Sequence, residues 1–446
     1  MNKRGDYFLK EVANHIKSKE AKNLVATELD FHLKQAKNMW IEKGLSEEVA
    51  EDKAVEQMGS PIKLGQELNK LHKPKVDWLI IILLVTAMGL GFLPVVAFGH
   101  TNDLLMNKVM CVILGIVTAL GMMMIDYRKL ERLGWLFYTI GVLILLMLDN
   151  FSNASMYGES LIKIGPITIG CLMAVPFFFL AWASFFNNSR LKVWHLGILY
   201  LFSLRLFLTM PSLSTTFIYI TMVFVMLWWS KLGKKKVLII TVVPICLSII
   251  GELFFHPPVK GVLLARILGY INPEQNADGA GFMYIRLKEV MSSAGWFGAS
   301  GNMKFIHAAR TDFVFASLTY YYGYFFALIL VLILSLFVAR IMVISYKIND
   351  RYGKLLLVGG MTLFVVQFIY NVGMILGLLP IASISLPFIS YGWMPTLFNA
   401  FLMGIVLSVY RRKNLISSSF YLPLLSRFIK SNFILRLHLD NAFAEF

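Results

Sequence analysis

An acidic residue, Asp312, stands at the end of a long polar segment and directly before an apolar run that begins at Phe313. The segment 256–312 is rich in basic residues, namely Lys260, Arg266, Arg286, Lys288, Lys304 and Arg310. A carboxylate beside cations stays ionised at neutral pH and can accept the proton of an attacking hydroxyl, and the cations suit an anionic, lipid-linked ligand. Two structural alternatives remain open. Asp312 or its neighbour caps the following helix, or the basic residues contact anionic lipid headgroups.

A second group of polar residues lies in the C-terminal apolar part of the chain. Gln367 and Asn371 fall inside one predicted helix, which leads through a Gly/Pro-containing stretch to Ser390 and Tyr391. Irregular backbone at membrane depth needs protein or water partners, so we expect these four residues to line a cavity. The alternative is that they hold helices together by hydrogen bonds.

The elements that position these residues are membrane-spanning helices. Hydrophobic residues make up 57% of the 446 residues, charged residues only 15%, and the mean hydropathy is +0.67. Soluble cores cannot bury that much apolar surface, whereas transmembrane helices need it. We therefore predict an all-α polytopic membrane protein with about ten transmembrane helices and a small soluble helical N-terminal domain. The expected spans are 77–98, 108–125, 133–149, 166–186, 195–210, 213–230, 236–255, 313–338, 355–379 and 394–410.

Basic clusters occur in every second connection between these spans. The positive-inside rule then predicts both termini on the cytoplasmic side and residues 256–312 as a large external loop. Segments 261–271 and 282–295 of this loop are amphipathic and are expected along the membrane surface. The net charge of +16 therefore reflects loops that orient a membrane protein, and nucleic-acid binding is excluded.

Residues 1–75 are expected to form a compact cytoplasmic helical domain. Phe8, Val12 and Ile16 recur every four residues and form one apolar stripe. Ser46 and Ser60 are placed to begin helices, and Gly59 to end one. Nothing in this part has catalytic spacing. The predicted organisation is a prefix domain at 1–75, a membrane domain at 76–413 and a cytoplasmic tail at 414–446.

The three cysteines, Cys111, Cys171 and Cys246, lie in apolar stretches without Cys-x-x-Cys spacing or a Cys/His pairing. They are predicted to be small membrane hydrophobes, so neither a disulfide framework nor a metal site is expected. The residues themselves specify no cofactor, although a divalent cation would be compatible with phosphate chemistry.

At the C-terminal motif the sequence resembles the SEDS family (shape, elongation, division and sporulation), the polytopic FtsW, RodA and SpoVE cell-wall proteins. The family has a Gly-Leu-x-Pro turn followed by Pro-Phe-Ile-Ser-Tyr-Gly-Gly, and this chain has Gly377-Leu-Leu-Pro380 and Pro387-Phe-Ile-Ser-Tyr-Gly392. Arg310-Thr-Asp-Phe-Val-Phe315 is similar to the family's His-Thr-Asp-Phe-Ile-Phe element. The resemblance spans roughly 77–413, and the N-terminal domain resembles a helical prefix domain of some permease-type proteins.

The chain departs from the family pattern at several positions. Met210-Pro-Ser-Leu-Ser-Thr215 stands where the family has Gln-Pro-Asp-Leu-Gly-Thr, so one family acid is missing. Gly170-Cys-Leu-Met173 replaces Gln-Pro-Ser-Glu, and Trp393-Met394 replaces a Gly-Ser pair. We interpret the sequence as a divergent member.

The resemblance implies a peptidoglycan glycosyltransferase that polymerises undecaprenyl-pyrophosphate-linked disaccharide during division, elongation or sporulation. It would act in the bacterial cell membrane beside a class B penicillin-binding transpeptidase. Asp312 is then the catalytic residue, and the expected substrate-binding residues are Arg286, Lys288, Arg310, Gln367, Asn371, Ser390 and Tyr391. Two alternatives belong to other classes: a flippase or transporter of the lipid-linked precursor, with Arg205 as its main intramembrane charge, and a catalytically inactive scaffold for cell-wall synthesis partners.

Overall fold

The computed structural model describes residues 3–98, 102–156, 159–164, 167–210, 212–255, 265–299, 301, 303 and 306–416. The chain divides into two compact units. One unit, here called the head, comprises Met1–Val76 and Tyr410–Phe446. The other, here called the membrane domain, comprises Asp77–Val409.

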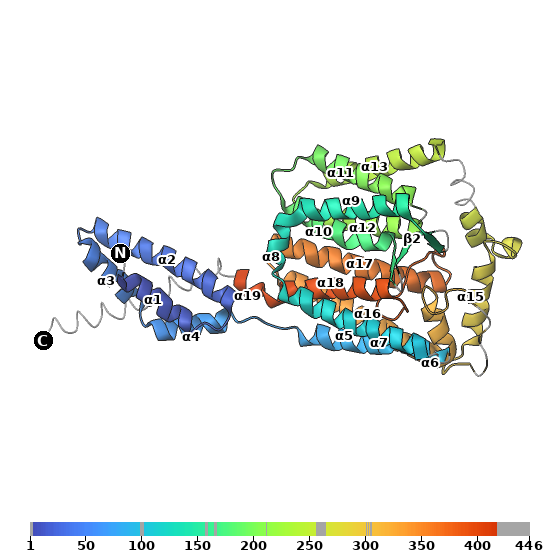
Figure 1. The fold of residues 1–446 in the computed structure, drawn as a ribbon, viewed down its shortest axis with the longest axis horizontal. Coiled ribbons are helices and arrows are strands. Elements are labelled where there is room, and N and C mark those ends of the chain that lie inside the picture. Colours follow the sequence, from blue (N-terminus) through green and yellow to red (C-terminus); the bar gives the residue numbers. More distant parts are fainter. Residues whose placement is uncertain are drawn as a thin grey trace. The chain divides into compact units, whose positions relative to one another are not determined.

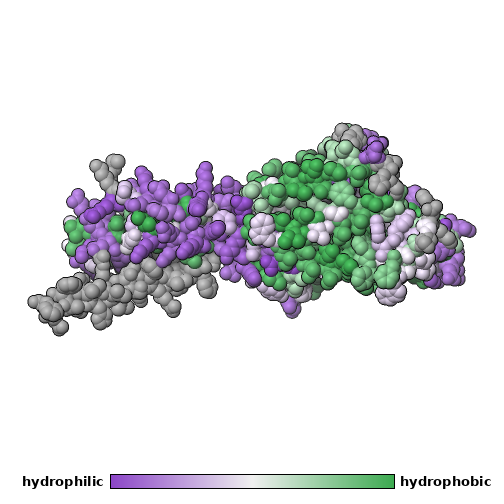
Figure 2. All heavy atoms as spheres, turned by 90° about the horizontal axis from the view of Figure 1, so that it is seen from below, coloured by the Kyte–Doolittle hydropathy of each residue, from purple (hydrophilic) through white to green (hydrophobic). Residues whose placement is uncertain are grey.

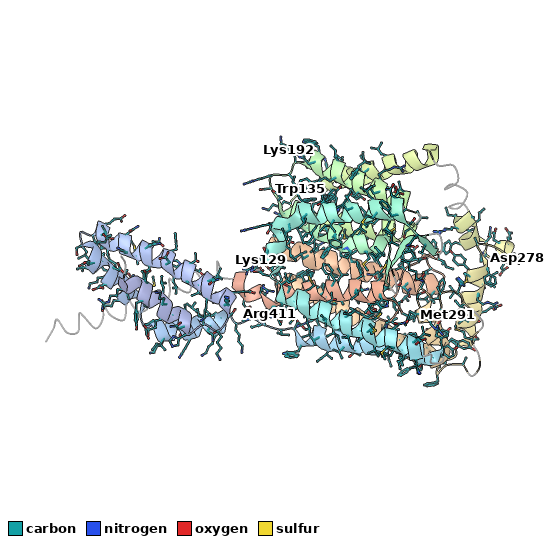
Figure 3. All side chains as sticks on the ribbon, in the orientation of Figure 1. Lys129, Trp135, Lys192, Asp278, Met291 and Arg411 are labelled. Atoms are coloured by element: carbon teal, nitrogen blue, oxygen red, sulfur yellow. The ribbon has the colours of Figure 1, made fainter. Side chains whose placement is uncertain are left out.

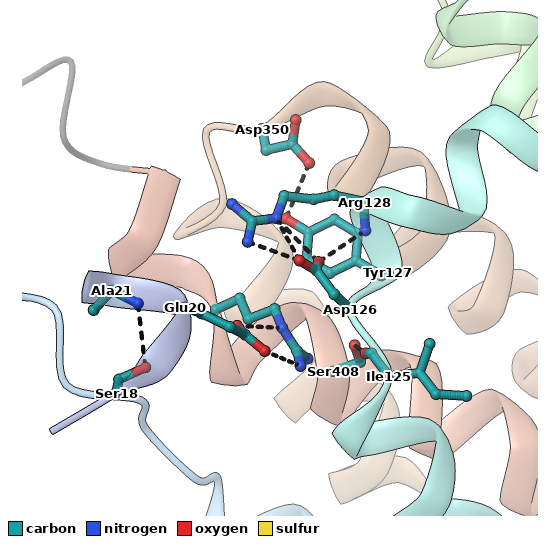
Figure 4. Close-up of polar contacts among 10 residues, drawn as sticks. Ser18, Glu20, Ala21, Ile125, Asp126, Tyr127, Arg128, Asp350 and Ser408 are labelled. Carbon is teal, nitrogen blue, oxygen red and sulfur yellow. Dashed lines mark hydrogen bonds and ion pairs between the residues drawn. The ribbon is translucent and has the colours of Figure 1, made fainter. Parts of the chain in front are cut away.

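The described part of the head is helical, as the sequence predicts. Its helices are α1 (Lys3–Asn14), α2 (Lys19–Glu42), α3 (Glu47–Met58), α4 (Pro61–Leu71) and the short α19 (Lys413–Ile416). Ser46 and Ser60 occupy the expected N-cap positions, and Gly59 ends α3 with a φ of 79°. The apolar stripe of Phe8, Val12 and Ile16 forms a core with residues of α2 and α4. Within the head, Glu20 also pairs with the nearly buried Arg412 at 2.8 Å (Figure 4).

The membrane domain is a bundle of apolar helices (Figure 1). Its helices in chain order are α5 (Trp78–Leu90), α6 (Leu93–Ala97), α7 (Asn102–Met124), α8 (Tyr127–Leu130), η1 (Glu131–Leu133), α9 (Gly134–Phe151), η2 (Cys171–Ala174), α10 (Val175–Asn187), α11 (Val193–Thr209), α12 (Leu213–Trp228), α13 (Lys234–Phe255), η3 (Glu274–Asn276), α15 (Phe282–Ser293), α16 (Val314–Tyr346), α17 (Arg351–Ile375) and α18 (Trp393–Arg411). Residues 265–271 are also helical.

The helices confirm the predicted all-α polytopic membrane fold. Six helical stretches of the described residues are long and apolar enough to cross a membrane: Trp78–Ala97, Asn102–Met124, Tyr127–Phe151, Val314–Tyr346, Arg351–Ile375 and Trp393–Arg411. Three shorter apolar helices, Cys171–Asn187, Val193–Thr209 and Leu213–Trp228, coincide with the fourth, fifth and sixth expected spans. The seventh expected span coincides with α13.

A small antiparallel sheet corrects the predicted start of the fourth span. The strands β1 (Ala154–Met156), β2 (Glu159–Ile164) and β3 (Ile167–Ile169) pair in the order β1-β2-β3. Ile167–Ile169 therefore belongs to a strand, and the helical part begins only at Cys171. The β-branched residues of β3 add to the apolar run of the following helix, so hydropathy alone does not separate the two elements.

Helix α17 lies at the centre of the bundle and packs against α10, α12 and α16. Most of its side chains are buried, including those of Gln367 and Asn371. Helix α18 is similarly buried along most of its length. Gln367 and Asn371 therefore project from a helix that is largely enclosed by other parts of the membrane domain.

The outer helices of the membrane domain expose apolar side chains instead. Trp78, Ile82, Val85 and Leu328 are among the exposed large hydrophobic residues, and hydrophobic residues cover most of the face of this domain seen in Figure 2. An apolar surface of this extent is stable in contact with lipid tails. The domain is therefore built to be surrounded by a bilayer.

The two ends of the bundle differ in their residues. Figure 3 shows the basic residues Lys129 and Lys192 at one end of the membrane domain, and Asp278 and Met291 of the long polar segment at the other. At the first end, Tyr127 donates a hydrogen bond to Asp350 (3.1 Å) and Ser408 donates one to the carbonyl of Ile125 (2.6 Å; Figure 4). These contacts join the connection between α7 and α8 to the start of α17 and to α18.

Candidate functional site

Asp312 lies directly before α16. The helix begins at Val314 with Phe313 as its N-cap residue, and the Phe313 side chain makes no cap hydrogen bond. Asp312 therefore does not cap α16, unlike the alternative drawn from the sequence. Its carboxylate is half-buried, and Oδ1 accepts a hydrogen bond from Ser385 Oγ at 3.4 Å. The carboxylate thus faces a hydroxyl of the segment that follows α17.

A cavity of about 370 Å³ contains Asp312 in its wall. Its other titratable lining residues among those described are Arg266, Tyr284 and His307. Arg266 and His307 are exposed, so both are accessible to a ligand. Burial raises the pKa of the Tyr284 hydroxyl, which therefore stays neutral at physiological pH. The described lining combines one carboxylate with a guanidinium and an imidazole, a set suited to a hydroxyl group and an anionic group held side by side.

The polar segment between α13 and α16 is tied to the end of α17 on the other side of this cavity. Tyr284 of α15 accepts a hydrogen bond from the backbone N–H of Ile381 at 2.8 Å. Tyr270, in the helical residues 265–271, donates one to the carbonyl of Leu378 at 3.0 Å. The two tyrosine rings lie 5.7 Å apart. Cavity walls that are far apart in the sequence are therefore joined by specific contacts.

Helix α16 is interrupted at Gly323, and the loop after α15 supplies hydrogen-bond partners to the interruption. Gly323 has a φ of 86° and a ψ of 171°, a conformation that glycine adopts without a side-chain clash. The loop supplies backbone partners on both sides of the break: Ala299 N to Tyr320 O at 2.8 Å, Tyr324 N to Gly295 O at 3.1 Å, and Phe325 N to Trp296 O at 3.2 Å. Irregular backbone at membrane depth needs such partners. The break thereby joins the segment after α15 to the helix that follows Asp312.

Three consecutive backbone carbonyls around Asp312 are held by hydrogen bonds from the C-terminal polar group. The N–H of Tyr391 donates to the carbonyl of Arg310 at 2.9 Å. Ser390 Oγ donates to the carbonyl of Thr311 at 2.7 Å. Asn371 Nδ2 donates to the carbonyl of Asp312 at 2.7 Å. The two polar regions recognised separately in the sequence therefore form one structure that fixes the position of Asp312.

The polar residues of α17 are buried and contact protein groups. Asn371 also donates to the carbonyl of Ile384 at 2.6 Å, so its amide bridges the two segments. Gln367 lies one turn deeper, where its amide contacts Asn399 of α18 at 3.2 and 3.4 Å. Gln367, Asn371 and Ser390 are almost fully buried. None of them is in the described lining of the Asp312 cavity, and their contacts are those of helix-joining residues.

The basic residues expected to bind phosphate lie at different places. Arg310 is half-buried, with its guanidinium over the ring of Phe98 at 5.2 Å. Arg286 pairs with Glu289 at 3.0 Å, and Lys288 is exposed on the same helix. Lys304 lies outside the described residues. None of the three described cations is in the described lining of the Asp312 cavity.

The structure brings three further residues to this region that the sequence does not assign to it. In the sequence Arg266 is one of several basic residues of the loop, and His307 is not among the predicted site residues. Lys108, expected at the beginning of a span, has its ammonium 3.3 Å from the carbonyl oxygen of Ser390 and 3.4 Å from that of Phe388. In the sequence, Lys108 is distinguished only as a charge at the beginning of a membrane span. Its partners lie about 280 residues away, so no local pattern predicts the contact.

The described residues do not gather three or more His, Cys, Asp or Glu side chains at a common point. Asp312 and His307 are the two metal-ligating side chains in the described cavity lining. Mg²⁺ commonly uses one or two carboxylates together with substrate phosphates and water. The cavity therefore fits a cation only when the substrate supplies most of the oxygen ligands.

Comparison with known proteins adds family relationships to this geometry. Residues 75–415 match the family model FTSW_RODA_SPOVE, described as cell cycle protein. The chain is 25% identical over 371 residues to peptidoglycan glycosyltransferase MrdB of Escherichia coli K12, covering 79% of this chain and 97% of that protein. It is 23% identical over 372 residues to probable peptidoglycan glycosyltransferase FtsW of Trichlorobacter lovleyi, covering 77% and 96%.

A solved structure of a peptidoglycan synthase complex, described as showing how polymerization and crosslinking are coordinated, contains a chain of similar fold. The TM-score is 0.63 with 23% sequence identity, and the match covers 76% of this chain and 98% of that chain. The likeness shows that the membrane helices described above follow the architecture of that chain.

Proposed function

Since this chain belongs to the FTSW_RODA_SPOVE family of cell cycle proteins, we propose that it is a peptidoglycan glycosyltransferase. Its proposed substrate is a disaccharide linked to undecaprenyl pyrophosphate, and its product is a longer glycan strand. The observation that carries the proposal is the Asp312 carboxylate in the wall of a cavity that also presents Arg266 and His307. The names of the relatives support the same chemistry.

In the proposed reaction, Asp312 is the general base. An acceptor hydroxyl attacks the anomeric carbon of the donor sugar while the carboxylate takes the hydroxyl proton. A new glycosidic C–O bond forms, the bond from that carbon to the pyrophosphate oxygen breaks, and the lipid pyrophosphate leaves with the electron pair. Tight control of the Asp312 backbone is useful here because a base must lie within hydrogen-bond reach of the proton it removes.

The departing pyrophosphate needs positive charge, and the cavity offers it. Arg266 can donate two hydrogen bonds to phosphate oxygens, and His307 adds a ring N–H donor. Arg310, Arg286 and Lys288 are proposed to attract the anionic lipid to this end of the bundle rather than to contact the reacting atoms. A divalent cation held by Asp312, His307 and the substrate oxygens would supply further charge neutralisation.

The proposed orientation places this cavity on the outer face of the cell membrane and both termini in the cytoplasm. The concentration of basic residues such as Lys129 and Lys192 at the opposite end of the bundle supports it (Figure 3). Because a related fold occurs in a peptidoglycan synthase complex, we also propose a class B penicillin-binding transpeptidase as the partner that crosslinks the strands.

Purified protein reconstituted with lipid-linked disaccharide tests the proposal. The expected result is glycan polymer longer than the disaccharide, assayed by gel electrophoresis with and without Mg²⁺. Reconstituted protein that is folded but yields no polymer, with or without a transpeptidase partner, would contradict the proposal. In that case, movement of labelled precursor across vesicles would support the transporter, and its absence would support the scaffold.

A further inference from the structure

The membrane helix α7 carries a fully buried lysine. The side chain of Lys108 is 0% exposed, although Met106 and Met110 of the same helix are 62% and 46% exposed. Its ammonium lies 3.3 and 3.4 Å from two backbone carbonyl oxygens, and no described carboxylate pairs with it. A buried ammonium without a carboxylate is strongly disfavoured unless neighbouring dipoles stabilise it. A charge kept at this depth therefore indicates a role beyond packing.

The two carbonyls belong to the turn that contains Phe388 and Ser390. Phe388 has a φ of 63°, which is uncommon for a residue other than glycine. Its ring packs against those of Phe337 and Phe364, with centroids 5.9 and 6.3 Å away. The backbone of this turn is therefore strained, and the ammonium of Lys108 lies where it can stabilise the two carbonyl dipoles.

The junction between α5 and α6 encloses the same contact. A Cβ atom on Gly91 would lie 2.6 Å from the carbonyl oxygen of Phe388 and 2.9 Å from Lys108 Nζ. The absence of a side chain at position 91 therefore permits the close approach of three segments. The α5–α6 junction, α7 and the segment after α17 therefore meet at the ammonium.

The turn also holds the segment that contains Asp312. Ser390, whose carbonyl contacts Lys108, donates through its hydroxyl to the carbonyl of Thr311, and Tyr391 N donates to that of Arg310. Lys108 itself is not in the described lining of the Asp312 cavity. Among the described residues, the hydrogen bonds of Lys108 connect it to the Asp312 segment through the turn.

We propose that Lys108 is a positioning residue, whose ammonium holds the Phe388–Ser390 turn and through it sets the position of the Asp312 carboxylate. The inference deepens the proposed glycosyltransferase function and rests on it for its kinetic consequences. It predicts a defect in kcat without a matching change in KM, because Lys108 lies outside the described lining of the cavity proposed to hold the substrates.

The test compares Lys108→Met, Lys108→Arg and the control Lys129→Met. Met keeps the length of the lysine stem and removes the charge, whereas Arg retains the charge and the donors. Lys129 is exposed at the opposite end of the bundle. A shift of a general base by roughly 1 Å costs about a hundredfold in rate, so kcat of Lys108→Met should fall by about that factor. Lys108→Arg should recover most of it, and Lys129→Met should match the wild type.

Hydrogen–deuterium exchange gives a second measurement that needs no turnover. Lys108→Met should raise exchange in residues 384–392 and 308–313 and leave α9 to α12 unchanged. Wild-type exchange in both segments, or an equal rise across all helices, would overturn the positioning role. A wild-type protein that makes no glycan would contradict the proposed function, and the exchange comparison would still decide the role of Lys108.

Discussion

Replacing Ser390 by Ala should impair both stability and turnover. Ser390 is 0% exposed, and its Oγ makes two hydrogen bonds. It accepts from the backbone N–H of Leu386 at 2.8 Å and donates to the carbonyl of Thr311 at 2.7 Å. Alanine removes both partners with little change in shape, so the effect reports on the hydrogen bonds.

The expected magnitude follows from the groups left behind. The buried N–H of Leu386 loses its partner, at a cost of about 1–3 kcal/mol. The partly buried carbonyl of Thr311 is left to water or to a weaker contact, at a cost of about 1 kcal/mol. The free energy of unfolding should therefore fall by about 2–4 kcal/mol. Because the lost bond adjoins Asp312, the rate should also fall by at least about tenfold.

Thermal unfolding of the detergent-purified protein measures the first quantity, and polymerisation of lipid-linked disaccharide measures the second. Ser292→Ala is the matched control, because Ser292 is exposed and its Oγ bonds only within its own helix, to Glu289 at 2.9 Å. The control should resemble the wild type. A Ser390→Ala protein with normal stability and rate would refute the reasoning, and a stability loss without a rate loss would refute the link to Asp312.

Three further predictions concern other parts of the chain. Gly323→Ala should lower the melting temperature, because position 323 has a φ of 86° and the new Cβ would clash with the carbonyl oxygen of Trp296. Gly360→Ala should be tolerated, since its Cβ would meet nothing closer than 3.9 Å. Equal melting temperatures of the two variants would contradict this reasoning. In a Cys246→Ala background, a membrane-impermeant maleimide should label Gln275→Cys but not Asn349→Cys in intact cells, and the reverse pattern would overturn the proposed orientation. Residues 1–75 alone should give a helical circular dichroism spectrum with a cooperative melt. Val12→Asp should abolish that melt, because Val12 is 0% exposed. An unfolded spectrum for the native segment would show that this part does not fold independently.

The helices could be predicted from the sequence because hydropathy responds to composition over whole turns. The apolar run at 355–379 predicts helix α17, and its Gln and Asn are unusual in such a run. The Gly/Pro-containing stretch that follows predicts irregular backbone before Ser390. The small sheet was missed, because β3 is only three residues long and merges into the apolar run of α10. A strand that short carries too little alternation to distinguish it from a helix.

The candidate site was predicted only in part, because its contacts are long-range. Asp312 and the Ser390 region were singled out, but their mutual hydrogen bonds join residues about 79 positions apart. Arg266 and His307 meet in one cavity through the path of the polar segment, which no local pattern specifies. Helix α16 also starts two residues after Asp312, and a boundary shift of that size decides whether an acid is a cap or a site residue.

The most direct measurement is the polymerisation rate of Asp312→Asn. Asparagine keeps the size of the side chain and an oxygen that can accept from Ser385, while the backbone carbonyl of Asp312 keeps its bond to Asn371. Asp278→Asn is the control, an exposed acid of the same polar segment. Asp312→Asn should melt as the wild type does and polymerise about a hundredfold to ten-thousandfold more slowly, with Asp278→Asn unaffected. A stable Asp312→Asn protein that polymerises at the wild-type rate would contradict the assignment of Asp312 as the general base.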